Sequence, residues 1–109
     1  MDTDAILVLT TAPDPEVATQ LARGLVDAKL AACVNVIGGM TSVYRWRGEV
    51  HEDAEVQLLV KTRDALLPAI ETWLDTHHPY DVPELLALPV SDGSSGYLTW
   101  LAEQTELGS

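Results

Sequence analysis

The stretch HHPYDVPE, residues 77–84, concentrates groups that bind metals or transfer protons: two imidazoles, a phenol and two carboxylates. His77 and His78 are adjacent, and adjacent side chains diverge on a regular element, so they make a poor chelating pair. We expect His77 to interact with the carbonyls at a helix end. Pro79 restricts His78 to an extended backbone, so its ring can point into a cleft. The stretch is therefore either a rigid binding loop or an elaborate turn.

Two further side chains have metal-binding chemistry. Cys33 is the only cysteine. Its thiolate could bind a soft ion such as copper, although a buried cysteine is most often a small apolar filler. Without a second cysteine, a tight thiolate site must take ligands from elsewhere in the fold or from another subunit. Glu84 opens the last predicted strand, where it could be a ligand, a base or a solvated charge.

A second group of side chains could line a cleft for an organic ligand. Lys61 shares a strand face with Gln57 and Leu59, where a lysine must be paired, face a wet cleft or extend to solvent. Tyr80 lies between two prolines, which suits a structural turn and a fixed binding loop equally. Trp46 is of a type that packs or forms interfaces more often than it binds ligands. No nucleophile–base set or phosphate loop can be read from the spacings, so no enzymatic activity is predicted.

Composition narrows the class of protein. The 109 residues suit a single domain spanning 1–109, without an interdomain cleft. A net charge of −11 would repel nucleic acid and anionic membrane surfaces, so neither is an expected partner. No apolar run approaches the roughly 20 residues that cross a bilayer, and the start does not look like a secretory signal. With one cysteine, the chain suits a reducing compartment, and we expect a cytoplasmic protein.

Periodicity supplies the elements that position these groups. Strands are expected at 5–12, 32–47, 49–62 and 85–91, and helices at 14–30, 64–78 and 97–106. Gly38 and Gly39 indicate a bulge, and Gly48 indicates the reversal of a long hairpin. The order βαββαβ, followed by a short terminal helix, predicts a ferredoxin-like α+β sandwich.

Three of the predicted strands are apolar on both faces. In the first strand Ile6 and Val8 alternate with Leu7 and Leu9. Two helices can cover only one face of the sheet, and a bare apolar face in a soluble protein usually marks a partner surface. We therefore expect a homo-oligomer whose sheets pack face to face, with the long hairpin adding strands to a neighbour.

Four segments of the chain form an ordered set of motifs: LAACVNVIGGMTSVYRWRGEV, EVQLLVKT, HPYDVPELLALPV and YLTWL. Together they resemble the CutA family of divalent-cation tolerance proteins, and the likeness runs from about Leu7 to Leu101. The resemblance implies a ferredoxin-like trimer, related in fold to PII-type signalling proteins, and a link to copper tolerance. The positions that match the family's recurring residues are Cys33, Tyr44, Trp46, Gly48, Lys61, His78, Pro79, Tyr80, Pro83, Glu84 and Trp100. Asp81 departs from the glutamate that is more usual after the tyrosine.

Two functions compete at this stage. The first is a cytosolic homotrimer involved in the response to divalent metal ions, with copper as the first candidate and Cys33, His78 and Glu84 as candidate ligands. The alternative is a PII-like trimeric sensor that binds a small organic or anionic ligand between subunits. Trp46, Lys61 and Tyr80 are its candidate cleft residues. A hydrolase using His78 and a carboxylate is a weaker third hypothesis.

Overall fold

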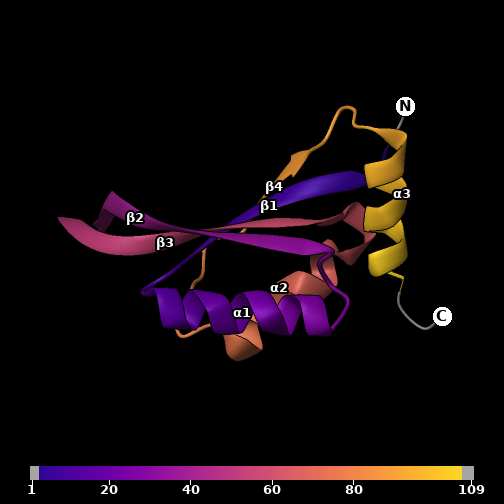
Figure 1. The fold of residues 1–109 in the computed structure, drawn as a ribbon. Coiled ribbons are helices and arrows are strands. Elements are labelled where there is room, and N and C mark those ends of the chain that lie inside the picture. The colour runs from indigo at the N-terminus through magenta and orange to yellow at the C-terminus, as the bar shows by residue number, and fades with distance from the viewer. Residues whose placement is uncertain (1–2, 107–109) are drawn as a thin grey trace.

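The chain folds around a four-stranded antiparallel sheet, which the computed structural model describes within residues 3–106. The strands lie in the order β2-β3-β1-β4 (Figure 1). They span Ala5–Ala12 (β1), Cys33–Trp46 (β2), Glu49–Arg63 (β3) and Leu86–Pro89 (β4). This arrangement confirms the predicted ferredoxin-like α+β fold. The expected domain of 1–109 also includes residues 1, 2 and 107–109, which lie outside the described residues.

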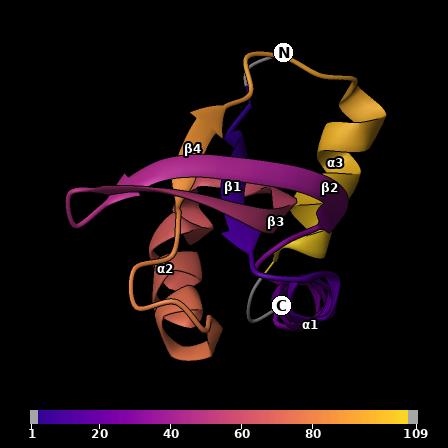
Figure 2. The ribbon, with the colours of Figure 1, turned by 90° about the vertical axis from the view of Figure 1, so that its left-hand side faces the viewer.

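Two helices cover one face of the sheet, and a third stands at one end of it (Figures 1 and 2). The helices span Pro15–Asp27 (α1), Leu67–His77 (α2) and Ser95–Gln104 (α3), and a 3-10 turn at Asp64–Leu66 precedes α2. As expected, Asp14 caps α1, because its carboxylate accepts a 2.8 Å hydrogen bond from the Val17 amide. Pro68 falls in the first turn of α2, where its missing N–H interrupts nothing.

Helix α1 ends at Asp27, three residues before the predicted end at residue 30. The chain leaves the helix through Lys29, which adopts a left-handed φ of 61°. The Leu30 amide then donates a 3.0 Å hydrogen bond back to the Leu25 carbonyl. The prediction was wrong because glycine, the usual residue at such a stop, is replaced here by a lysine. This exit turns Leu30 into the core.

The hairpin of β2 and β3 has the predicted bulge and tight turn. Its register shifts between Ile37 and Met40, around Gly38 and Gly39. At the tip, Arg47 and Gly48 both have positive φ, 51° and 80°, as a two-residue hairpin turn of the I′ type requires. The hairpin projects well past the end of α1 (Figure 1), so its tip is uncovered within one chain.

The main core lies between the sheet and helices α1 and α2. Alternation directs Ile6, Val8 and Val60 toward the helices, where they are almost fully buried. The helices contribute their own apolar faces to this layer. The members from the helices and from the turn after α1 are Leu25, Leu30, Ala31, Leu66, Ile70 and Leu74.

The opposite face of the sheet, here named the open face, is largely uncovered. The strand register places on it the side chains of Leu7, Leu9, Cys33, Asn35, Ile37, Leu59, Lys61, Leu86 and Leu88. Leu86 is 56% exposed, Leu88 47% and Ile37 48%, which is high for aliphatic side chains in a sheet.

Helix α3 covers only one end of the open face. Leu101 packs there against Ala5 and Ala32. Arg63 fixes the helix end, donating to the Thr105 hydroxyl at 2.9 Å and to its carbonyl at 2.6 Å. The packing site of this helix was not predicted. Among residues 3–106, no other segment covers the rest of the open face.

Two fully buried threonines on the helix side of the sheet form a matched pair for a stability test. Thr62 donates a 2.7 Å hydrogen bond to the Leu30 carbonyl, whereas the Thr10 hydroxyl has no partner among residues 3–106. We expect Thr10→Val to raise the free energy of unfolding by about 1 kcal/mol, since an unsatisfied hydroxyl is removed at nearly constant volume. Thr62→Val should lower it by about 1–2 kcal/mol. Urea unfolding at one fixed protein concentration measures both; changes of the same sign would contradict the assignment.

Candidate functional site

The octapeptide forms the turn that leads from α2 to β4. Helix α2 ends at His77, and His78 has an extended backbone with φ −78° and ψ 140°. The expectation that Pro79 drives His78 out of the helix is therefore confirmed. The His78 side chain is 7% exposed, so it points into the protein.

Both ring nitrogens of His78 are engaged within the chain. Nε2 lies 2.7 Å from the Thr11 carbonyl oxygen, and Nδ1 accepts a 3.1 Å hydrogen bond from the Tyr80 amide. A carbonyl only accepts and an amide only donates, so the proton is on Nε2 and the lone pair on Nδ1. Ligation of a metal by either nitrogen would break one of these two buried contacts.

Tyr80 fastens the same turn to the hairpin. Its hydroxyl donates a 2.8 Å hydrogen bond to Glu55 on β3, and its ring lies 4.7 Å from that of His78, centre to centre. Burial, followed by the bond and the charge of Glu55, raises the pKa of the Tyr80 hydroxyl. The two residues hold the turn at two points, Thr11 on β1 and Glu55 on β3.

A second phenol–carboxylate pair lies beside the first. Tyr44 on β2 donates a short hydrogen bond to Asp53 on β3, and its ring stacks on His51 with centroids 5.5 Å apart. The hydrogen bond to Asp53, aided by desolvation, raises the pKa of the Tyr44 hydroxyl. Asp53 and Glu55 share one face of β3. We name Tyr44, Asp53, Glu55 and Tyr80 the phenol–carboxylate cluster.

Sequence reasoning missed this cluster. The alternation of Tyr44 and Trp46 was visible, but their partners on β3 depend on the bulge at residues 38–39, which changes the register by one residue. The contact of Tyr80 with Glu55 joins segments 25 residues apart. The available signal was the pair of acidic residues at alternate positions of β3, Asp53 and Glu55, on the strand that pairs with the tyrosine-bearing β2.

The three candidate metal ligands lie apart in one chain. Cys33 is half-buried on the open face, in register with Lys61 near the end of β3. His78 contacts β1 at Thr11, toward the end of β1 that lies away from Cys33. Glu84 is exposed and precedes β4. Within residues 3–106, no three His, Cys, Asp or Glu side chains gather closely enough to hold an ion. A chelate within a single chain does not fit these residues.

The three candidate cleft residues are also spread along the hairpin. Trp46 is 50% exposed near the tip, where the Arg47 guanidinium lies 5.7 Å from the centre of its ring. Lys61 lies at the opposite end, on the same strand face as Gln57 and Leu59, as predicted. Tyr80 contacts the middle of β3 through Glu55. One chain therefore does not close a cleft around them.

Known proteins match almost the whole chain. The family described as CutA1 divalent ion tolerance protein matches residues 6–104. The chain belongs to the CutA1 family. A relative named divalent-cation tolerance protein CutA, from Thermus thermophilus, is 50% identical over 99 residues, covering 91% of this chain and 96% of its own length.

A solved structure and a further named relative also match the chain. The crystal structure of CutA1 from Oryza sativa superimposes with a TM-score of 0.93 at 43% identity and covers 97% of each chain. A relative from Arabidopsis thaliana named protein CutA, chloroplastic, is 46% identical over 101 residues, which is 93% of this chain and 56% of its own length. In the described part of our CutA1-family chain, every helix is too short or too polar to span a bilayer.

The Tyr80–Glu55 bond predicts an alkaline loss of stability. An unfolded tyrosine loses its proton near pH 10, whereas the folded Tyr80 keeps it to higher pH, so stability falls as pH rises above about 10. The slope should be less than about 1.4 kcal/mol per pH unit, because the phenol is partly solvated. Tyr80→Phe should remove this component in urea unfolding at pH 9 and pH 10.5. Tyr97→Phe on α3 is the control, and equal slopes for Tyr80→Phe and wild type would refute the assignment.

Proposed function

We propose that this CutA1-family chain forms a cytoplasmic homotrimer that acts in tolerance of divalent metal ions, with copper as the first candidate. The family match over residues 6–104 carries the proposal, together with the name of the Thermus thermophilus relative, divalent-cation tolerance protein CutA. The single cysteine is compatible with a reducing compartment. The net charge of −11 concentrates cations at the surface.

The open face supports association with other copies of the chain. Burial of aliphatic side chains such as Leu86 and Leu88 gains roughly 25 cal/mol for each Å² removed from water. The projecting hairpin also exposes Val43 and Val50 near its tip, where its own helices do not reach. A neighbour that covers both surfaces would remove the largest exposed aliphatic groups of the sheet.

A metal site in this assembly would be shared between subunits. Cys33 lies on the open face, so face-to-face packing would bring its thiol close to groups of another chain. Glu84 is exposed and free to approach a neighbour, whereas His78 is committed to Thr11 and Tyr80. We therefore assign the soft ligand to Cys33 and a second, oxygen ligand to Glu84. His78 would join only by giving up a buried hydrogen bond.

A second candidate function rests on Lys61. This half-buried lysine lies between Cys33 and Leu7 on the open face and forms no ion pair within residues 3–106. A neighbouring subunit over that face would bury the ammonium, which then needs a carboxylate or a bound anion. In a PII-like sensor, a small anionic or organic ligand bound between subunits would pair with this ammonium. Trp46 and Tyr80 would come from other parts of the assembly.

Titration of the metal-free protein with Cu(I) and Cu(II) tests the first function. We expect Cys33→Ala to weaken Cu(I) binding at least tenfold, because a thiolate is the softest ligand available. Glu84→Gln should weaken Cu(II) binding. His78→Ala should leave copper affinity unchanged while lowering stability by about 1–3 kcal/mol, since it leaves buried groups unpaired. Equal copper affinities of the wild-type protein and Cys33→Ala would contradict the assignment of Cys33 as a copper ligand.

The same preparation separates the two functions. Citrate and ATP serve as anionic probes, and a ligand present at 100 times its dissociation constant stabilises the folded state by about 2.7 kcal/mol. Under the sensor hypothesis one of them raises the melting temperature, and Lys61→Met abolishes the shift. Under the metal hypothesis neither does.

A further inference from the structure

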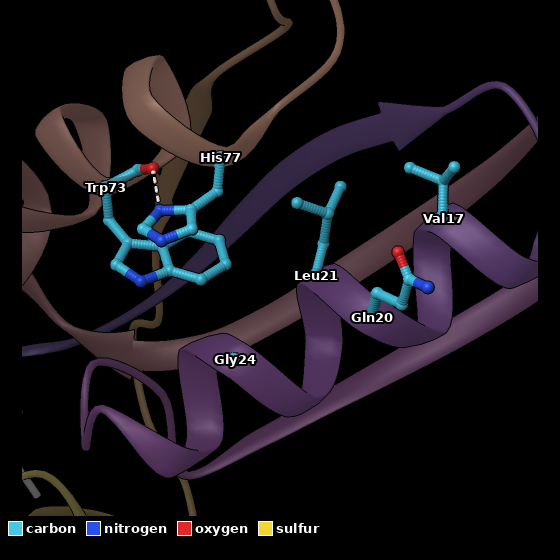
Figure 3. Close-up of a pocket in the computed structure, with 6 residues that line it drawn as sticks. All are labelled: Val17, Gln20, Leu21, Gly24, Trp73 and His77. Carbon is cyan, nitrogen blue, oxygen red and sulfur yellow. Dashed lines mark hydrogen bonds between the residues drawn. The ribbon is translucent and has the colours of Figure 1, made fainter.

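A groove of about 340 Å³ lies between α1 and α2 (Figure 3). One wall comes from α1 and the other from the last turns of α2. Its lining residues are Val17, Gln20, Leu21, Gly24, Trp73 and His77. The groove belongs to the helix layer, on the opposite side of the sheet from the open face. Packing through the open face alone leaves the groove uncovered, and the groove is separate from the copper and anion sites considered above.

The α2 wall is a preformed aromatic surface. The rings of Trp73 and His77 stack with centroids 4.1 Å apart and planes 18° from parallel. The indole lies against the α1 backbone at Gly24, where an added Cβ would come within 2.5 Å of it. A glycine inside a helix costs roughly 1 kcal/mol relative to alanine, so α1 gives up stability where the indole needs the space. The two rings are thereby held in place without a ligand.

Hydrogen bonding leaves defined polar groups at the groove. His77 Nδ1 lies 2.8 Å from the Trp73 carbonyl oxygen, which can only accept, so Nδ1 carries the proton. In the neutral ring, Nε2 is then an acceptor without a partner among the described residues. The amide of Gln20, on the α1 wall, is likewise unpaired within residues 3–106 and offers both a donor and an acceptor. Val17 and Leu21 make the rest of that wall apolar.

We propose that this groove binds a small, planar, uncharged or cationic heteroaromatic compound that donates an N–H to His77 Nε2. Sites for small molecules are mostly apolar, about 300–1,000 Å³ in volume, and carry few polar groups, and this groove lies at the lower end of that range. A single fused ring system is small enough to enter such a space. The protein's charge of −11 disfavours an anionic ligand. Apolar contact with Val17 and Leu21 contributes further binding energy.

Three related compounds test the proposal on the whole protein. Benzimidazole has the N–H donor, 1-methylbenzimidazole lacks it, and benzimidazole-5-carboxylate adds a negative charge. The indole N–H signals of Trp46, Trp73 and Trp100 report binding separately in ¹H–¹⁵N NMR spectra. We expect benzimidazole to shift the Trp73 signal saturably and to leave the other two in place. 1-Methylbenzimidazole should bind three- to tenfold more weakly, as for the loss of one hydrogen bond, and the carboxylate more weakly than benzimidazole.

Substitution of His77 distinguishes the site from non-specific stacking. His77→Phe keeps a ring beside Trp73 but removes Nε2. The variant should therefore bind benzimidazole no more tightly than it binds 1-methylbenzimidazole. His51→Phe, on the hairpin, is the matched control and should leave the affinity for benzimidazole unchanged. An unshifted Trp73 signal at millimolar benzimidazole overturns the proposal. So do equal affinities of wild type for benzimidazole and its methyl derivative, or an undiminished affinity in His77→Phe.

Discussion

Apolar side chains line both faces of the sheet, whereas α1 and α2 cover only one of them. On the covered face, Val8 and Val60 are buried by the chain's own helices. On the open face, α3 covers one end, around Ala5, Ala32 and Arg63, and Leu86 and Leu88 stay exposed. The hydrophobic effect thus stabilises the fold from one side and favours association from the other. The hairpin extends beyond the helices, so its apolar side chains are also left uncovered by them.

The polar groups of the octapeptide have a structural task that limits their chemistry. His78 and Tyr80 tie the turn to β1 and β3, and in doing so they use the nitrogens and hydroxyl that a metal or substrate would need. Cys33 and Lys61 are different, because they lie on the open face and their side chains form no hydrogen bond or ion pair within residues 3–106. In the proposed assembly, chemistry shared between subunits would depend on Cys33 and Lys61, together with the exposed Glu84, rather than on the two histidines of the turn.

Sequence patterns predicted most of the fold because they report local geometry. Alternation, the glycines of the bulge and the turn at Gly48 were sufficient for the hairpin, and Asp14 for the start of α1. The features that were not predicted depend on contacts between distant segments, or lack a signal in the local sequence. The packing of α3 on Ala5 and the contact of Tyr80 with Glu55 depend on three-dimensional register, and the stop at Lys29 lacks its usual glycine.

The candidate site was predictable residue by residue but not as an arrangement. Cys33, His78 and Glu84 have the chemistry of metal ligands, yet one chain keeps them apart. Their ability to bind one ion therefore depends on how another subunit covers the open face. Static light scattering of the wild-type protein at micromolar concentration measures the mass of the particle, and so the number of associated chains. The proposed homotrimer should scatter as a particle of about three times 11.8 kDa. A well-folded particle of 11.8 kDa, with the open face in water, would contradict it.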